Sequence, residues 1–397
     1  MKRRNFIKSS ALASTALWVP SFLKGHSTDT LLKTRSGKIL IVIQLGGGND
    51  GLNTIIPYRN DLYYKYRPSL GIKQKEVLKV SEQLGFNPEM QALQSLYDQG
   101  LLGVINNVGY PNPDRSHFRS MDIWHTASDS TEYLSTGWLG RYLDSDCKGC
   151  ITPYHALEVD DSLSLAMKGI YNSGFAMGDA KRLRKATDNR FLKAIAQQEH
   201  DHDHENIEYL YKTMIDTQHS AEYLYQQSKV YQSKVKYPNT PFGKDLKQIS
   251  ELITADTDTK VYYTSLTGFD THANQKGKQG RLLKQYAEGM KALVEDLKRN
   301  NLLNDTLIMT FSEFGRRVKQ NGSGGTDHGT ANNLFLIGGN LRKAGFFNNG
   351  PDLQKLDKGD LIYQVDFRNI YATILENWLE ADAPAVLGKN FTKLNIL

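Results

Sequence analysis

The sequence predicts an α/β fold in which a mostly parallel central sheet is flanked by helices and interrupted by a helical insertion. Residues 38–45 form a continuous apolar run rich in Ile and Val, which is typical of a strand buried on both faces of such a sheet. Similar runs recur at residues 260–266 and 306–311. Residues 280–298 carry apolar side chains at the i, i+3, i+4 spacing of an amphipathic helix.

The remaining elements continue the alternation of strand and helix. A helix at residues 87–99 and a strand at residues 101–108 give the chain a βαβ-like opening, and residues 117–126 are expected to form the next helix. Two further elements are expected near the C-terminus, a strand and a helix: residues 333–337 and residues 369–379.

A helical insertion is expected between about residue 156 and about residue 255, because the strand pattern there gives way to long polar helices such as residues 206–234. The rest of residues 33–397 is expected to be one α/β domain. With 397 residues, 39% of them hydrophobic and 23% charged, the chain is long enough for one large domain or two modest ones.

The first 25 residues are typical of a twin-arginine signal segment. The basic stretch KRRNFIK precedes a weakly apolar run at residues 9–23, which is short for a membrane span of roughly 20 residues. The alternative is a basic amphipathic helix. A twin-arginine signal predicts a bacterial protein that is exported by the twin-arginine translocase and is periplasmic or secreted.

The net charge argues against nucleic acid as a partner. The formal charge is +6, but five of these charges belong to basic residues in the first 25 positions, where no acidic residue occurs. The rest of the chain is therefore nearly neutral and has no basic stripe for a phosphate backbone.

The two cysteines, Cys147 and Cys150, are spaced as C-K-G-C. They are expected to form a local disulfide or to remain two free thiols. A redox or metal centre is disfavoured, because no thioredoxin-like βαβ pattern surrounds the pair.

Acidic and histidine side chains recur where the predicted strands end. Because ligands gather outside the carboxyl ends of strands in open α/β sheets, these side chains are expected to bind one or two divalent metal ions. A mixed carboxylate and imidazole set suits zinc, and also manganese or iron, and suits calcium less well because calcium prefers oxygen alone. For Glu313 the alternative is a structural ion pair with Arg316 or Arg317. The candidate ligands are Asp50, Asp270, His272, Glu313, Asp327 and His328.

A candidate nucleophile, Ser116, stands at the start of the helix at residues 117–126. Backbone N–H groups and the helix dipole favour an anion at this position, and Arg115 and His117 beside it are further catalytic candidates. The alternative role of Ser116 is that of an N-cap. Four other residues are expected to bind the anion: Asn49, Asn53, Arg119 and Arg316.

Seven sequence segments together resemble the exported family called domain of unknown function 1501. This family is similar to a distant branch of the alkaline phosphatase and sulfatase superfamily. The resemblance therefore implies an alkaline-phosphatase-like three-layer sandwich. The segments extend over essentially the whole chain and read RRNFIK, IQLGGGNDGLNTIIPY, SHFRSMDIWHTA, TGWLGRYLD, FDTHANQ, SEFGRR and GTDHGTANNLFLIGG.

The resemblance also implies roles for single residues. Asp50 matches the metal-binding Asp of the superfamily, Ser116 matches its nucleophile, and Asp270 with His272 approximates a metal-binding pair. His328 matches the final metal-binding His. Phe314, however, stands where the superfamily has another metal-ligating His, and an apolar ring cannot coordinate a cation.

Two functions follow as hypotheses. The first is an exported metal-dependent hydrolase of phosphate or sulfate esters that acts on a small anionic ester. The second is a catalytically degenerate binding or assembly protein on the same fold, with another exported protein as its partner.

Overall fold

The computed structural model describes residues 37–146, 153–188 and 205–397. Lys38–Leu397 form one compact unit. The twin-arginine segment and both cysteines lie outside the described residues. Within the described residues, no helix is both long enough and apolar enough to span a membrane.

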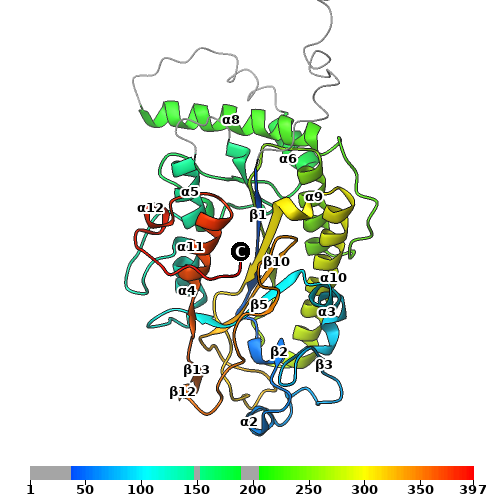
Figure 1. Cartoon of the computed structure of the whole chain (residues 1–397). Coiled ribbons are helices and arrows are strands. Elements are labelled where there is room, and N and C mark those ends of the chain that lie inside the picture. Colours follow the sequence, from blue (N-terminus) through cyan, green and yellow to red (C-terminus); the bar gives the residue numbers. More distant parts are fainter. Residues whose placement is uncertain (1–36, 147–152, 189–204) are drawn as a thin grey trace, which may run out of the picture. The chain divides into compact units, whose positions relative to one another are not determined.

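A nine-stranded, mostly parallel sheet forms the centre of this unit (Figure 1). β1 lies between β8 and β9 and is parallel to both, whereas β10 is antiparallel to its neighbours β9 and β5. The expected βαβ-like opening is wrong in one respect, because β9 and β10 separate β5 from β1. In their order across the sheet the strands are β11 (Gly345–Phe346), β5 (Leu102–Gly109), β10 (Asn332–Gly338), β9 (Thr306–Phe311), β1 (Ile39–Gly46), β8 (Val261–Thr267), β6 (Ala156–Glu158) and β7 (Phe175–Ala176), with β14 (Val365–Asp366) also paired to β5.

The sheet is covered by helices on both faces, because the side chains of its central strand alternate between two hydrophobic clusters. Ile41 and Ile43 of β1 belong to one cluster, and Leu40 and Val42 belong to the other. The predicted α/β class with a mostly parallel sheet flanked by helices is confirmed. The first cluster is completed by α3 (Gln91–Asp98), α9 (Pro241–Thr254) and α10 (Gln275–Arg299), and the second by α4 (His117–Thr126), α5 (Trp138–Asp146), α11 (Phe367–Asn377) and α12 (Ala383–Leu387) (Figure 1).

The segment predicted as a helical insertion is only partly separate from the sheet. Its strands β6 and β7 extend the sheet beyond β8, and α9 packs against α10. These strands have three and two residues, which is too short for a period-2 pattern to appear in the sequence. The helical part consists of α6 (Ala180–Thr187) and α8 (Glu205–Gln227), which pack against each other.

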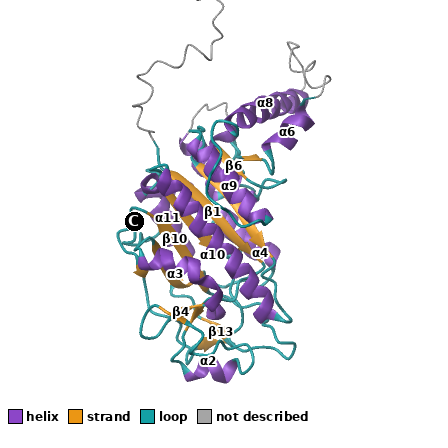
Figure 2. Ribbon diagram, turned by 90° about the vertical axis from the view of Figure 1, so that its right-hand side faces the viewer, coloured by secondary structure: helices purple, strands orange, loops and turns teal. Residues whose placement is uncertain are grey.

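Small elements lie at the other end of the strands from α6 and α8 (Figure 2). They have a small hydrophobic cluster of their own, which includes Leu52, Ile56 and Leu361. Here the loops that leave the carboxyl ends of the parallel strands are packed. The elements are α2 (Asp61–Tyr66), a three-stranded sheet of β2 (Ile55–Ile56), β4 (Gly85–Phe86) and β3 (Leu78–Lys79), and a hairpin of β12 (Leu356–Asp357) and β13 (Asp360–Leu361).

Candidate metal centre

The candidate residues come together at the carboxyl edge of the main sheet. The parallel strands β8, β1 and β9 end almost level with one another there, because Gly46 pairs with Thr267 and Gln44 pairs with Phe311. The chain leaves β5 at the same edge and enters α4 at His117. Loops from four strands therefore meet at one place, as in other open α/β sheets.

The Asp270 carboxylate lies at the centre of three imidazole rings. Its Oδ1 is 3.0 Å from Nε2 of His272 and 3.3 Å from Nε2 of His328, and its Oδ2 is 3.6 Å from Nε2 of His117. His117, Asp270 and His328 each offer a ligand atom within 4.8 Å of the other two. These four residues are called the Asp270 cluster below.

Each histidine of the cluster is held through its other ring nitrogen. Nδ1 of His117 donates to Oε1 of Glu313 at 2.9 Å, and Nδ1 of His328 donates to the carbonyl oxygen of Arg115 at 2.8 Å. Nδ1 of His272 lies 3.3 Å from Oδ1 of Asp327. A neutral ring that donates through Nδ1 presents the lone pair of its Nε2 on the side of Asp270, where a cation could bind.

The three Nε2 atoms differ in their surroundings among the described residues. Nε2 of His117 is buried and forms no hydrogen bond with any of them. Nε2 of His272 and Nε2 of His328 lie 2.9 Å apart, and both lie within 3.3 Å of Oδ1 of Asp270. When both rings are neutral with the proton on Nδ1, the two lone pairs repel at this distance, and a cation bound by both nitrogens would remove the repulsion.

This arrangement fits a divalent metal ion. Metal-ligating histidines usually donate their second ring N–H to a carboxylate or a backbone carbonyl, as His117, His272 and His328 do here. Imidazole nitrogens with one carboxylate are typical ligands of zinc, and also suit manganese and iron. The side chain of Asp270 is 48% exposed, so one side of the cluster is open to solvent.

The cluster also has a defined charge pattern. Partial burial would raise the pKa of Asp270, but hydrogen bonds from Arg316 and His328 lower it to about 2. The hydrogen bond to Glu313 raises the pKa of His117, whereas burial lowers the pKa of His328. Asp270 is therefore a carboxylate throughout the neutral range and can serve as an anionic ligand.

Asp50 does not belong to this cluster, in contrast to the expectation that it would bind metal. It is 1% exposed, and its two oxygens accept hydrogen bonds from Arg67 at 2.5 and 2.9 Å. Gln275 and the backbone N–H of Leu52 also donate to this carboxylate. A buried carboxylate needs such a partner, and the guanidinium supplies the positive charge that a metal was expected to supply.

Glu313 and Asp327 lie behind the histidines instead of inside the cluster. Oε1 of Glu313 also accepts the backbone N–H of Gly47 at 2.8 Å, and its Oε2 accepts from the hydroxyl of Ser312 at 3.1 Å. Asp327 accepts from Asn321 at 3.1 Å. Both carboxylates thus orient imidazoles in the described structure.

The four residues expected to bind an anion are all buried and bonded to protein groups. Asn49 and Asn53 bond to neighbouring side chains and to the backbone, and Arg119 donates to backbone carbonyls of residues 129–132. Arg316 donates to four backbone carbonyls and to Asp270, so it joins the loops that carry the cluster. We therefore assign Asn49, Asn53, Arg119 and Arg316 to the support of the loops.

Ser116 keeps a free hydroxyl at the start of α4. The residue is exposed and occupies the N-cap position, but its hydroxyl forms no hydrogen bond with any residue that the structure describes. Arg115 pairs instead with the buried carboxylate of Asp360. Phe314 is 2% exposed, and its ring lies 4.9 Å from that of His117 and 4.8 Å from that of His328.

Sequence reasoning missed Arg67 and Asp360, the two partners that neutralise Asp50 and Arg115. Neither stands in a strand-end motif. The hydrogen bonds to Glu313 and to the Arg115 carbonyl were also missed, since they join residues about 200 positions apart. The sequence carries no local signal for such partners.

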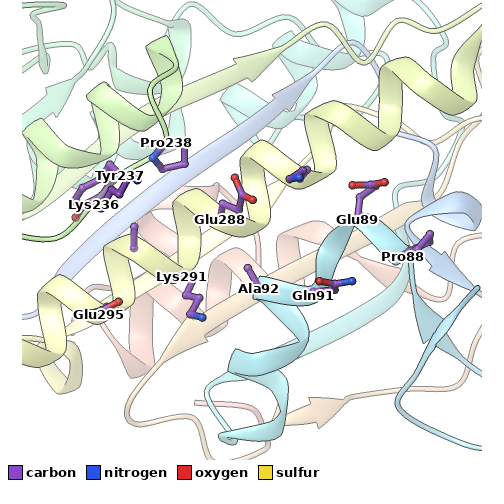
Figure 3. Close-up of a pocket in the computed structure, with 12 residues that line it drawn as sticks. Pro88, Glu89, Gln91, Ala92, Lys236, Tyr237, Pro238, Glu288, Lys291 and Glu295 are labelled. Carbon is purple, nitrogen blue, oxygen red and sulfur yellow. The ribbon is translucent and has the colours of Figure 1, made fainter.

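Two of the cavities in the described part of the chain have both acidic and basic side chains in their lining. One, of about 750 Å³, lies between α3, α10 and the loop before α9, and it contains none of the candidate residues (Figure 3). Its lining includes Glu89, Glu288, Lys236 and Lys291. The other, of about 600 Å³, is lined partly by Glu313 and Phe314.

A family model described as "Protein of unknown function (DUF1501)" matches residues 37–382. Among curated proteins none matches this sequence.

Several solved structures are similar to this chain in fold. The C-terminal periplasmic domain of EcEptC from Escherichia coli, in complex with Zn, has 11% identity and a TM-score of 0.37, and the match covers 76% of this chain and 72% of that one. The PsFucS1 sulfatase from Pseudoalteromonas sp. has 10% identity and a TM-score of 0.36, with 91% and 70% covered. Murine ectonucleotide pyrophosphatase/phosphodiesterase 5 has 10% identity and a TM-score of 0.31, with 70% and 57% covered.

Proposed function

The chain belongs to the DUF1501 family of proteins of unknown function, as its motifs predicted, and we propose that it is an exported metal-dependent hydrolase of phosphate or sulfate esters. The observation that carries the proposal is the Asp270 cluster. Three imidazoles anchored through Nδ1 direct Nε2 toward one carboxylate, and the buried Nε2 of His117 has no hydrogen-bond partner in the described structure.

We propose that the cluster holds one divalent ion, zinc in the first instance. Asp270, His328 and His117 would be the ligands, with His272 as a fourth. A second ion at Asp50 is not part of the proposal, because Arg67 already neutralises that carboxylate. The ion would supply a Lewis acid that polarises a phosphoryl or sulfuryl oxygen.

Ser116 is the proposed nucleophile. It precedes His117 directly, its hydroxyl is free, and it lies at the N-terminus of a ten-residue helix, where backbone N–H groups favour an anion. Its oxygen would attack phosphorus or sulfur and expel the alcohol, which leaves with the hydroxyl proton. Water would then cleave the serine ester and release phosphate or sulfate.

The proposal is tested by metal analysis and by turnover of the purified full chain. Mass spectrometry should find about one equivalent of metal per chain, and p-nitrophenyl phosphate or p-nitrophenyl sulfate should be hydrolysed. Ser116→Ala should abolish turnover and keep the metal, whereas His328→Ala should lose both. His155→Ala, which removes a histidine paired with Asp258 away from the cluster, should change neither. A protein that binds no metal would refute the proposal.

A second candidate function is that of an exported binding or assembly protein. It is favoured by Phe314, which is buried against two histidines of the cluster, and by the Asp50–Arg67 pair. Both features remove groups that the resemblance assigned to metal binding. One equivalent of metal without turnover of any ester, together with co-purification of another exported protein, would support this function over hydrolysis.

A further inference from the structure

The cavity of about 600 Å³ adjoins the Asp270 cluster. Three of the residues that line it contact a histidine of the cluster. Glu313 accepts from His117, the Arg115 carbonyl accepts from His328, and the Phe314 ring packs on both imidazoles. A molecule in this cavity would therefore lie next to any group that the cluster holds.

The opposite wall of the cavity comes from the β12–β13 hairpin, which lies below α4 in Figure 1. The hairpin is fixed to the site by the ion pair between Arg115 and Asp360 and by a hydrogen bond of 2.5 Å from the Thr330 hydroxyl to the carbonyl of Leu361. Asp360 is 1% exposed, so this ion pair is shielded on the hairpin side. The cavity is thus formed by anchored elements.

The charges of the lining are unfavourable for a strongly anionic ligand. Arg115 is neutralised by Asp360, and Glu313 is bonded to His117. Two carboxylates, Asp114 and Asp357, remain against one cation, Lys358. An ester whose alcohol part carries several negative charges, such as a nucleoside polyphosphate, would be repelled. The hydroxyl groups of an uncharged alcohol would instead find hydrogen-bond acceptors.

The lining also offers aromatic and apolar surface. Tyr110 and Phe314 are 3% and 2% exposed, so the ring surface comes mainly from the half-buried Tyr363, beside Ile362, which is 49% exposed. Cavities of 300–1,000 Å³ are typical of small-molecule sites. One ring face beside carboxylate acceptors suits a ring that carries hydroxyl groups.

We propose that this cavity binds the alcohol part of the ester and that the alcohol is an uncharged sugar. The inference rests on the proposed function, since the phosphate or sulfate group would lie at the Asp270 cluster. It adds a substrate class, the sugar monoesters, and it assigns the discrimination between alcohols to the β12–β13 hairpin.

Kinetics of the metal-loaded full chain test the substrate class. Glucose 6-phosphate and glucose 6-sulfate are compared with ethyl phosphate and ethyl sulfate. The kcat/KM of the glucose esters should be at least about tenfold higher than that of the ethyl esters. This factor corresponds to about one hydrogen bond to a charged group. In Asp357→Ala the ratio of the two kcat/KM values should fall about tenfold. Asp352→Ala, which removes an exposed carboxylate from the same segment outside the cavity, should keep the ratio.

Binding separates the two proposals. Calorimetry on the Ser116→Ala variant should give a Kd for glucose 6-phosphate at least about tenfold lower than for ethyl phosphate, and Asp357→Ala should remove the difference. Preferred sugar binding without turnover in the unmutated protein would refute the hydrolase and keep the cavity assignment. Hydrolysis without any preference for sugar esters, or equal binding of both probes, would overturn the cavity assignment and keep the hydrolase.

Discussion

Oε1 of Glu313 accepts a hydrogen bond of 2.9 Å from Nδ1 of His117, and this bond joins two residues that are 196 positions apart. Glu313 is 1% exposed and is held in turn by the backbone N–H of Gly47. The carboxylate therefore fixes both the orientation and the tautomer of His117, and it leaves Nε2 free on the side of Asp270.

The substitution Glu313→Gln is expected to weaken metal binding. The amide loses the charge that raises the pKa of His117 and holds its Nδ1–H. Loss of such an outer partner typically costs 10–100-fold in metal affinity, so we expect about that decrease in competition with a chelator. Glu251→Gln is the matched control, since Glu251 is also buried and accepts the N–H of Ser233 far from the cluster. Unchanged zinc affinity in the Glu313 variant would contradict the assigned role.

Asp50→Ala is expected to destabilise the fold and to leave the metal in place. The variant leaves Arg67, which is 1% exposed, without a counter-charge. Breaking a buried ion pair in this way lowers the free energy of unfolding by about 3–5 kcal/mol. Urea titration measures this cost. The control is Asp305→Ala, which breaks an exposed pair with Lys38 and should cost about 0–1 kcal/mol. If Asp50 were a ligand, the variant would lose zinc instead of keeping one equivalent.

Gly48→Ala is expected to disturb the cluster through Phe314. Gly48 has a φ of 71°, and a Cβ at this position would overlap the Phe314 ring. The left-handed backbone alone costs an L-residue about 1–2 kcal/mol, and the displaced ring would press on His117 and His328. Thermal unfolding should show lower stability, and chelator competition should show weaker zinc binding. In Gly322→Ala, where a Cβ meets open space, the thermal stability and the zinc affinity should both be unchanged.

The stability of the metal-free protein is expected to fall between about pH 6.5 and about pH 4 because of His125. This imidazole is buried beside Gln44 and Tyr263, and burial lowers its pKa from 6.5 to about 4. In this range the unfolded chain takes up a proton that folded His125 does not, so acidification favours unfolding. The loss should approach about 3 kcal/mol.

Urea titrations in a chelator at several pH values measure this effect. His125→Gln should flatten the dependence, and the control His155→Gln should keep it. Equal slopes in the unmutated protein and in His125→Gln would show that another group causes the change.

Replacement of Arg3 and Arg4 by lysine is expected to stop export. The proposed signal depends on the arginine pair in KRRNFIK, and the double substitution keeps the charge of this stretch. Fractionation of expressing bacteria should find the unmutated protein outside the cytoplasm and the double variant inside it. Equal export of both would show that the twin-arginine translocase is not the route.

The fold could be predicted from the sequence wherever a buried element has a local pattern of apolar residues. Residues 38–45 became β1 because a strand between two helical layers needs apolar side chains on both faces, and residues 117–126 became α4. β6 and β7 were missed because they are too short to show a pattern.

The site could be predicted only in part, for a related reason. Strand ends pointed to Asp270, His272 and His328, which the structure brings together. Whether a carboxylate faces a metal or a guanidinium depends on a partner that arrives from elsewhere in the chain. Asp50 is the example, since Arg67 follows it by 17 residues without any motif.

The antiparallel direction of β10 brings both ends of the loop between β9 and β10 to the site. Because β10 is antiparallel to β9, the loop between them leaves and re-enters the sheet at the same edge. Glu313 lies near the start of this loop, and His328 lies near its end. The tip of this loop, residues 319–325, is held in place, because Asn321 donates to Asp327 and to the carbonyl of His272, and Gln320 accepts from the backbone N–H groups of residues 69 and 70. A change in the length of this tip would therefore reach His272 through Asn321, so the loop links its exposed tip to the geometry of the cluster.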